Sequence, residues 1–155
     1  MIINSVLLDM DLQRAFALVT CRVSEWCPED LRHIGDRNSS IFLLASGRFY
    51  ERAGDGREID LGKVTLWNKP HVLVLDFYVA TGPDHPTEVE IRFEAEEAAT
   101  RVTVIHRPKF VGRALAALRD VLVYRSRVTR ATWEALTDSR YSTLVISRLS
   151  VTNRS

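Results

Sequence analysis

The sequence has few cysteines and no long apolar run, so it offers little for disulfides, zinc sites or membrane spans. Two cysteines in 155 residues, Cys21 and Cys27, do not make a disulfide framework or a zinc site. Both are expected to be small buried or half-buried apolar residues in a reducing cytoplasm. No apolar run approaches the roughly 18 residues of a membrane span, and no secretory signal opens the chain. We therefore expect a cytoplasmic protein without membrane insertion.

Metal ligands are also sparse. His33, His71 and His85 fall in predicted loops or on a small predicted helix, with no spacing that suggests a shared metal ion. No glycine-rich phosphate loop or nucleophile elbow is present. With 46% hydrophobic residues, the chain can bury a real core without disulfides or metals. A single domain over residues 1–155, with no cofactor, is the expectation.

The charge is unevenly distributed although the net charge is only +1. Up to His106 the sequence has 17 acidic and 11 basic residues, a net charge of −6, and from Arg107 onward it has 3 acidic and 10 basic ones, a net charge of +7. The basic residues of this tail are spaced out, and aromatic residues do not interleave them as a single-strand groove would need. We expect basic helices beside an acidic sheet, and no nucleic-acid partner.

What is present is a series of strands from Gly47 to His106, separated by short turns. The predicted strands cover 48–52, 58–67, 72–80, 87–96 and 100–107. Each connection is too short for a crossover helix, so neighbours should pair as antiparallel hairpins. Alternation then predicts which side chains face inward. These are Phe49 and the sets Leu73, Leu75, Phe77, Val79; Val89, Ile91, Phe93; and Val102, Val104, His106.

One strand breaks the alternation. Its apolar residues can share the buried face only if the pairing slips near Gly62, which predicts a bulge there. These residues are Ile59, Leu61, Val64 and Leu66.

Helical patterns flank the strands. Residues 2–8 are predicted as a first strand, followed by a helix over 11–21 capped by Asp9 or Asp11. Pro28 indicates a second short helix over 28–34, and 41–45 returns to the sheet. Apolar stripes predict a helix over 111–124 and another over 132–149, although 142–147 is rich in β-branched residues and could be extended.

This order of elements is the helix-grip plan, an α+β fold in which a curved antiparallel sheet wraps a long C-terminal helix. Several segments then resemble, in order, a known family: 17–20, 25–28, 47–52, 55–58, 62–64, 69–70, 88–93 and 100–107. Together they are similar to the activator of heat-shock-protein-90 ATPase homologue-like family of the START/polyketide cyclase-like (SRPBCC, Bet v-like) superfamily. The family's usual Gly-Trp before the last helix is Thr132-Trp133 here. Residues 133–138 also resemble the family's first helix, and a closing helix explains them better than the relic of a second domain.

The resemblance implies a cavity between the sheet and the C-terminal helix that binds a small hydrophobic or amphipathic molecule. The same residues also describe an ordinary hydrophobic core, so the cavity is implied by the architecture and not by any one residue. The expected ligand-binding residues are Phe49, Ile59, Leu61, Leu73, Leu75, Phe77, Ile91, Phe93, Val104, His106 and Trp133.

Three functions stay open. A carrier or sensor without catalysis ranks first. The second is an enzyme of the polyketide cyclase or dehydratase type, in which His106, a weak catalytic candidate, would need a partner such as Tyr50, Tyr141 or Arg140. The third is a chaperone-linked interaction module, implied by the family name alone. A homodimer and the identity of the ligand are also left open.

Overall fold

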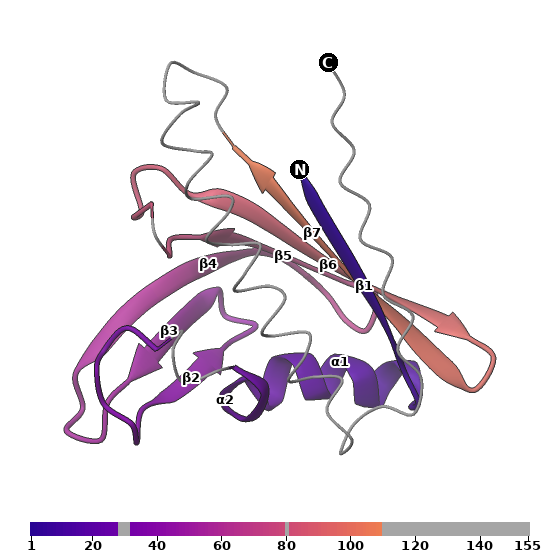
Figure 1. The fold of residues 1–155 in the computed structure, drawn as a ribbon, viewed down its shortest axis with the longest axis horizontal. Helices are drawn as coiled ribbons and strands as arrows, with labels where there is room; N and C mark the ends of the chain where they lie inside the picture. The colour runs from indigo at the N-terminus through magenta and orange to yellow at the C-terminus, as the bar shows by residue number, and fades with distance from the viewer. Residues whose placement is uncertain (28–31, 80, 110–155) are drawn as a thin grey trace.

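Seven strands form a single curled antiparallel sheet in the computed structural model, which describes residues 1–27, 32–79 and 81–109 (Figure 1). The spatial order of the strands is β1-β7-β6-β5-β4-β3-β2. Strands β3 to β7 pair as consecutive hairpins, which confirms the prediction, while β2 pairs with β3 and β1 closes the sheet against β7. The strands are β1 (Ile2–Leu8), β2 (Ser40–Leu43), β3 (Arg48–Arg52), β4 (Glu58–Asn68), β5 (Val72–Phe77), β6 (Thr87–Glu96) and β7 (Ala99–Pro108).

Helix α1 (Leu12–Cys21) begins where the sequence predicts. Asp11, and not Asp9, is its N-cap, because the Asp11 Oδ1 accepts a hydrogen bond of 2.9 Å from the Arg14 backbone N–H. The residues that α1 buries follow a helical period and include Ala15, Phe16 and Val19. Cys21, the last residue of α1, is exposed. The expectation that both cysteines are buried or half-buried is therefore wrong for Cys21. No helix in the described ranges is both long and apolar enough to cross a bilayer.

The second helix of the described residues lies before Pro28. Helix α2 covers Val23–Trp26, and residues 32–34 are irregular. The predicted helix over 28–34 is therefore wrong at 32–34, because the backbone N–H groups of His33 and Ile34 bind a side chain on β3 instead of continuing a helix. Its first residues, 28–31, lie outside the described residues, as do the predicted helices over 111–124 and 132–149.

Strand β5 is shorter than predicted. It ends at Phe77, because the Tyr78 carbonyl accepts from the Thr81 and Gly82 N–H groups and closes a turn there. Val79 therefore lies beyond the strand, although it still packs against the core.

Two bulges shape β4. The register shifts between Phe49, opposite Gly62, and Tyr50, opposite Asp60, which confirms the irregularity predicted near Gly62. A second shift lies between Val64 and Leu66.

The apolar residues of β4 differ in their burial. Leu61 and Val64 are buried, whereas Ile59 is 40% exposed and Leu66 is 47% exposed. The expectation that all four are buried is therefore wrong for Leu66, which lies on the outer face, and for Ile59, which pairs with the inward Glu51 near the start of β4 but remains exposed. The second bulge turns Trp67 towards the core in place of Leu66.

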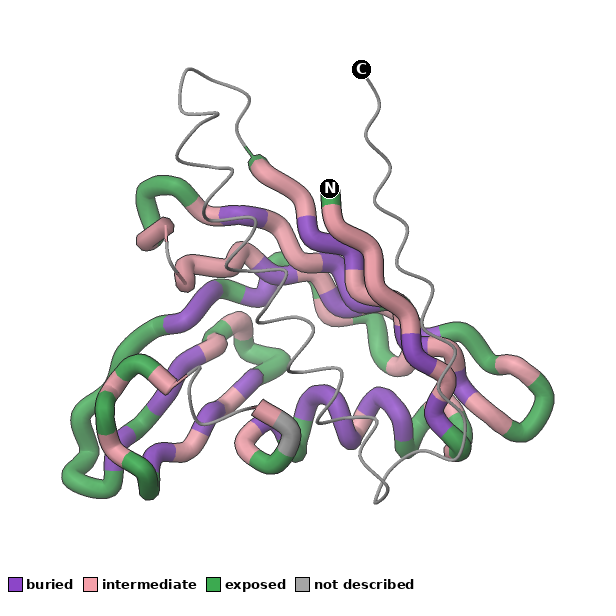
Figure 2. The backbone as a smooth tube through the Cα atoms, viewed as in Figure 1, coloured by how far each residue is buried: buried purple, intermediate pink, exposed green. Residues whose placement is uncertain are grey.

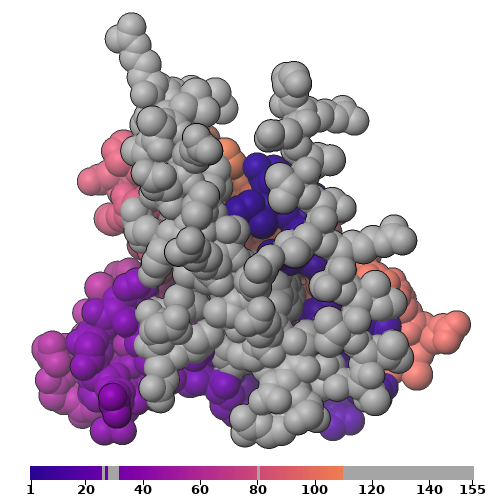
Figure 3. All heavy atoms as spheres, viewed as in Figure 1, coloured from indigo at the N-terminus to yellow at the C-terminus, as the bar shows by residue number. Residues whose placement is uncertain are grey.

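The core lies between α1 and one face of the sheet, which we call the inner face. Phe16 on α1 contacts Trp67 and Phe93, with ring centroids 5.4 and 5.0 Å apart, respectively. Figure 2 shows the buried positions along α1 and on the strands above it. Figure 3 shows the β2–β4 region and the β6–β7 hairpin at opposite sides of the view.

Candidate functional site

The inner face continues along the strands beyond the part that α1 packs against. Thr87 lies six residues before Phe93 on β6, roughly 20 Å along the strand from the Phe16 contact. The pairing β5–β6–β7 brings further residues to this end of the face. We call this group the distal patch: Phe49, Phe77, Thr87, Val89, Val104 and His106.

Aromatic rings and valines make most of the distal patch. Phe49 and Phe77 stack at 6.2 Å between centroids with 21° between their planes. Gly62 makes this approach possible, because a Cβ there would lie 2.3 Å from the Asp76 carbonyl oxygen and 3.2 Å from the Phe49 ring. Phe49, Phe77, Val89 and Val104 are half-buried and pack against the core. The patch therefore has an apolar surface that continues the core.

His106 and Thr87 are the polar pair of the distal patch. The Thr87 Oγ1 and the His106 Nε2 are 2.7 Å apart, and the two residues are 1% and 3% exposed. The Phe77 ring meets the imidazole edge-on at 5.9 Å between centroids. A buried hydrogen bond between a hydroxyl and an imidazole fixes the ring orientation. The inward position predicted for His106 is confirmed.

Charged side chains lie almost entirely on the opposite, outer face. Of the charged residues on the seven strands, only Glu51 projects from the inner face; the others occupy the alternate positions. Arg107 on β7 pairs with Glu88 at 2.8 Å and with Glu90 at 2.6 Å. Lys109 pairs with Asp76 at 2.5 Å. The distal patch thus faces away from the ion pairs of the sheet.

The outer-face ion pairs change the acidity of their members. At Glu90 partial burial raises the pKa, but hydrogen bonds from Arg92 and Arg107 outweigh it, so the pKa of this carboxyl lies below its ordinary value. Hydrogen bonds from Arg48 and Arg52 lower the pKa of the exposed Glu58 carboxyl. These carboxylates are therefore bound in their charged form.

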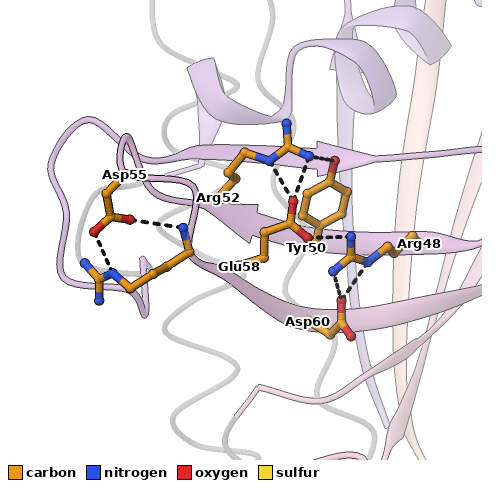
Figure 4. Close-up of polar contacts among 7 residues, drawn as sticks. Arg48, Tyr50, Arg52, Asp55, Glu58 and Asp60 are labelled. Carbon is orange, nitrogen blue, oxygen red and sulfur yellow. Dashed lines mark hydrogen bonds and ion pairs between the residues drawn. The ribbon is translucent and has the colours of Figure 1, made fainter.

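Tyr50 belongs to this outer face and not to the distal patch. The Arg48 guanidinium lies 4.0 Å from the centroid of the Tyr50 ring, and Phe42 stacks on the ring at 5.1 Å. Figure 4 shows Arg48 and Arg52 around Tyr50, bound to Glu58 and Asp60. Tyr50 alternates with the inward-facing Phe49 on β3, so it cannot act as the partner of His106. The other suggested partners, Tyr141 and Arg140, lie outside the described residues.

The predicted ligand-binding residues separate into groups. Phe49, Phe77, Val104 and His106 come together in the distal patch. Five others are buried in the core: Leu61, Leu73, Leu75, Ile91 and Phe93. Ile59 is exposed at the far end of β4, and Trp133 lies outside the described residues.

Three residues of the inner face did not emerge from the sequence. Thr87 is the first residue of β6. The only sequence signal for its inward position is that it continues the series of odd-numbered inward residues of this strand. Trp67 is turned inward by the second bulge. Glu51 is completely buried, and its carboxylate accepts hydrogen bonds of 2.7 Å from the His33 N–H and 2.6 Å from the Ser39 hydroxyl. Alternation with Phe49 places Glu51 inward, but nothing local predicts the loop that binds it.

Solved structures share this architecture. CalC from Micromonospora echinospora, a self-sacrificing resistance protein, matches with a TM-score of 0.60 and 20% identity, covering 88% of this chain and 95% of that one. An HSP90 activator from Plasmodium falciparum matches with a TM-score of 0.54 and 12% identity over 96% and 100% of the two chains. Protein Ms6760 from Mycobacterium smegmatis matches with a TM-score of 0.56 and 12% identity, covering 86% of this chain and 86% of that one. The described part of the chain has a Bet v-like α+β fold.

The Bet v-like fold is what the resemblance in the sequence implied, and the HSP90 activator is among the proteins that share it. No protein-family model matches the sequence, and no curated protein matches it significantly. At these identities the likeness establishes the fold alone, and function has to be argued from the distal patch.

Proposed function

We propose that the distal patch binds a small hydrophobic or amphipathic molecule, and that the protein acts as a carrier or sensor without catalysis. The observation that carries this proposal is the apolar surface of Phe49, Phe77, Val89 and Val104, which continues the inner face past α1 and remains half-buried. Ligand sites combine such an apolar wall with a few placed polar groups, and the His106–Thr87 pair is one. Closure of the site by the C-terminal segment stays a prediction from the sequence, as does the cytoplasmic location, and a homodimer stays open.

Binding without catalysis is favoured over the cyclase or dehydratase alternative. General acid–base chemistry by His106 would need a second polar group directed at the same substrate. Within the described ranges, Tyr50 points to the outer face, and Glu51 is occupied by the loop at 33–39. The chaperone-linked alternative is supported only by a shared fold with an HSP90 activator.

The proposal can be tested with a neutral fluorescent probe, N-phenyl-1-naphthylamine, whose emission rises and shifts to the blue in an apolar site. Val89 and Val74 offer a matched pair of half-buried valines on neighbouring strands, facing inward and outward respectively. We expect Val89→Phe to weaken probe binding at least tenfold by filling the patch, and Val74→Phe to change it less than twofold. Thermal unfolding followed by circular dichroism checks that both variants are folded. A wild-type protein that leaves the probe dark, or equal effects of the two substitutions, would refute the proposal.

A further inference from the structure

The separation of charge between the two faces of the sheet restricts the chemistry of the ligand. Charged side chains of the strands project outward, and the single inward one, Glu51, lies on β3 away from His106. The Glu51 carboxylate is already satisfied by the His33 and Ile34 N–H groups and the Ser39 hydroxyl. The described strands therefore offer a cationic ligand no free carboxylate on the inner face.

An ammonium group moved from water to such a surface loses its hydration and gains no ion pair. A neutral hydroxyl, phenol or carbonyl loses much less, and it can exchange hydrogen bonds with a buried polar pair. The Thr87 hydroxyl and the His106 imidazole, 2.7 Å apart, form such a pair beside the Phe77 ring. Both carry groups that can donate and accept hydrogen bonds.

We infer that the distal patch selects uncharged amphipathic molecules, whose polar group lies at the His106–Thr87 pair, and discriminates against ammonium ions. This inference rests on the proposed function and names the class of ligand that the same site takes. Thr87 is the positioning residue: its hydroxyl orients the imidazole that meets the ligand.

Ligands that share one alkyl chain test the selection directly. Decanol and decylammonium are each titrated against bound N-phenyl-1-naphthylamine at pH 7, where the amine is ionised. We expect decanol to displace the probe with at least tenfold higher affinity than decylammonium. If decylammonium displaces the probe as well as decanol does, the inference is wrong and the proposed function survives. If the probe itself does not bind, both are wrong.

Two threonine variants test the role of the polar pair. Thr87→Val removes the hydroxyl from His106, whereas Thr103→Val removes a comparable hydrogen bond, 2.8 Å to the Ser5 hydroxyl, on the outer face. We expect Thr87→Val to lower the affinity for decanol three- to tenfold and Thr103→Val to leave it within twofold. Equal affinities in the two variants would overturn the assignment of the polar pair. Unfolding curves of both variants ensure that the compared proteins are folded.

Discussion

The ring of Phe16 on α1 lies 5.0 Å from the ring of Phe93 on β6, between centroids, and both side chains are almost completely buried. Trp67 meets Phe16 edge-on from β4, at 5.4 Å. This aromatic group joins the helix to the sheet and marks where the core ends and the distal patch begins. The same face of the sheet therefore serves stability at one end and, in our proposal, binding at the other.

Phe16→Ala should lower the free energy of unfolding by about 3–5 kcal/mol, because it removes a fully buried ring and leaves a cavity. Urea denaturation followed by tryptophan fluorescence measures this loss. Phe42→Ala is the control, since Phe42 is half-buried on the outer face against Tyr50. A loss in the Phe16 variant no larger than in the Phe42 variant would contradict the central place of this aromatic contact.

Gly62→Ala should destabilise the protein by about 1–3 kcal/mol. The new methyl group would lie 2.3 Å from the Asp76 carbonyl oxygen, so β4 and β5 would have to separate at the stack of Phe49 and Phe77. Gly54→Ala is the matched control, because its methyl group would meet only the Asp36 carboxylate at 3.4 Å. Thermal unfolding of the two variants provides the comparison, and equal melting temperatures would show that the close approach at Gly62 is unimportant.

Glu51→Gln should release the loop at 32–39. The substitution replaces one acceptor oxygen by a donor N–H₂ group, so at least one of the donors on His33, Ile34 and Ser39 loses its partner. We expect a loss of about 1–3 kcal/mol in stability. Hydrogen exchange gives the specific signal: the amides of His33 and Ile34 should exchange faster, while those in the centre of β6 change only with global stability. Unchanged exchange at the two loop amides would contradict the role of Glu51.

The outer-face carboxylate of Glu90 should make stability depend on pH in the acid range. Its pKa is lower in the folded protein than its ordinary value of 4.5, so its contribution is complete above that value and is lost as the pH falls through the lowered one. Glu90→Gln should therefore flatten the decline of unfolding free energy between about pH 5 and pH 3, and cost about 1.5–3 kcal/mol at pH 7.

Glu94→Gln is the control for this measurement, because Glu94 lies on the same strand and face but is exposed. A surface substitution of this kind should change stability by less than about 0.5 kcal/mol. The role given to Glu90 would be wrong if both variants kept the acid dependence of the wild type.

Much of the sheet could be predicted because alternation and turn residues are local signals. Strand β6 matches its predicted bounds, since Val89, Ile91 and Phe93 alternate strictly with charged residues. The pairing of β1 with β7 joins segments almost a hundred residues apart, and no local pattern specifies it. The second bulge of β4 turns Trp67 inward in place of Leu66. It depends on the register with β5, and the residues of β4 alone do not indicate it.

The candidate site was only partly accessible to sequence reasoning. An inward His106 follows from the alternation of β7, but its bond to Thr87 depends on the β6–β7 register. Alternation cannot say how far α1 extends along the inner face, so residues beneath the helix and residues beyond it carry the same pattern. The sequence therefore predicted the same ligand-binding role for Leu73 and Phe93 as for Phe77 and Val104, although Leu73 and Phe93 are fully buried in the core.

The most direct test is to locate a bound neutral ligand on one face of the sheet by methyl NMR. With saturating N-phenyl-1-naphthylamine, we expect nuclear Overhauser contacts from the probe to the methyl groups of Val89 and Val104, on the inner face. The methyl groups of Val74 and Ile105, on the outer face of the same strands, should show none. Contacts to Val74 and Ile105, or a protein without contacts to any of the four, would contradict binding at the distal patch.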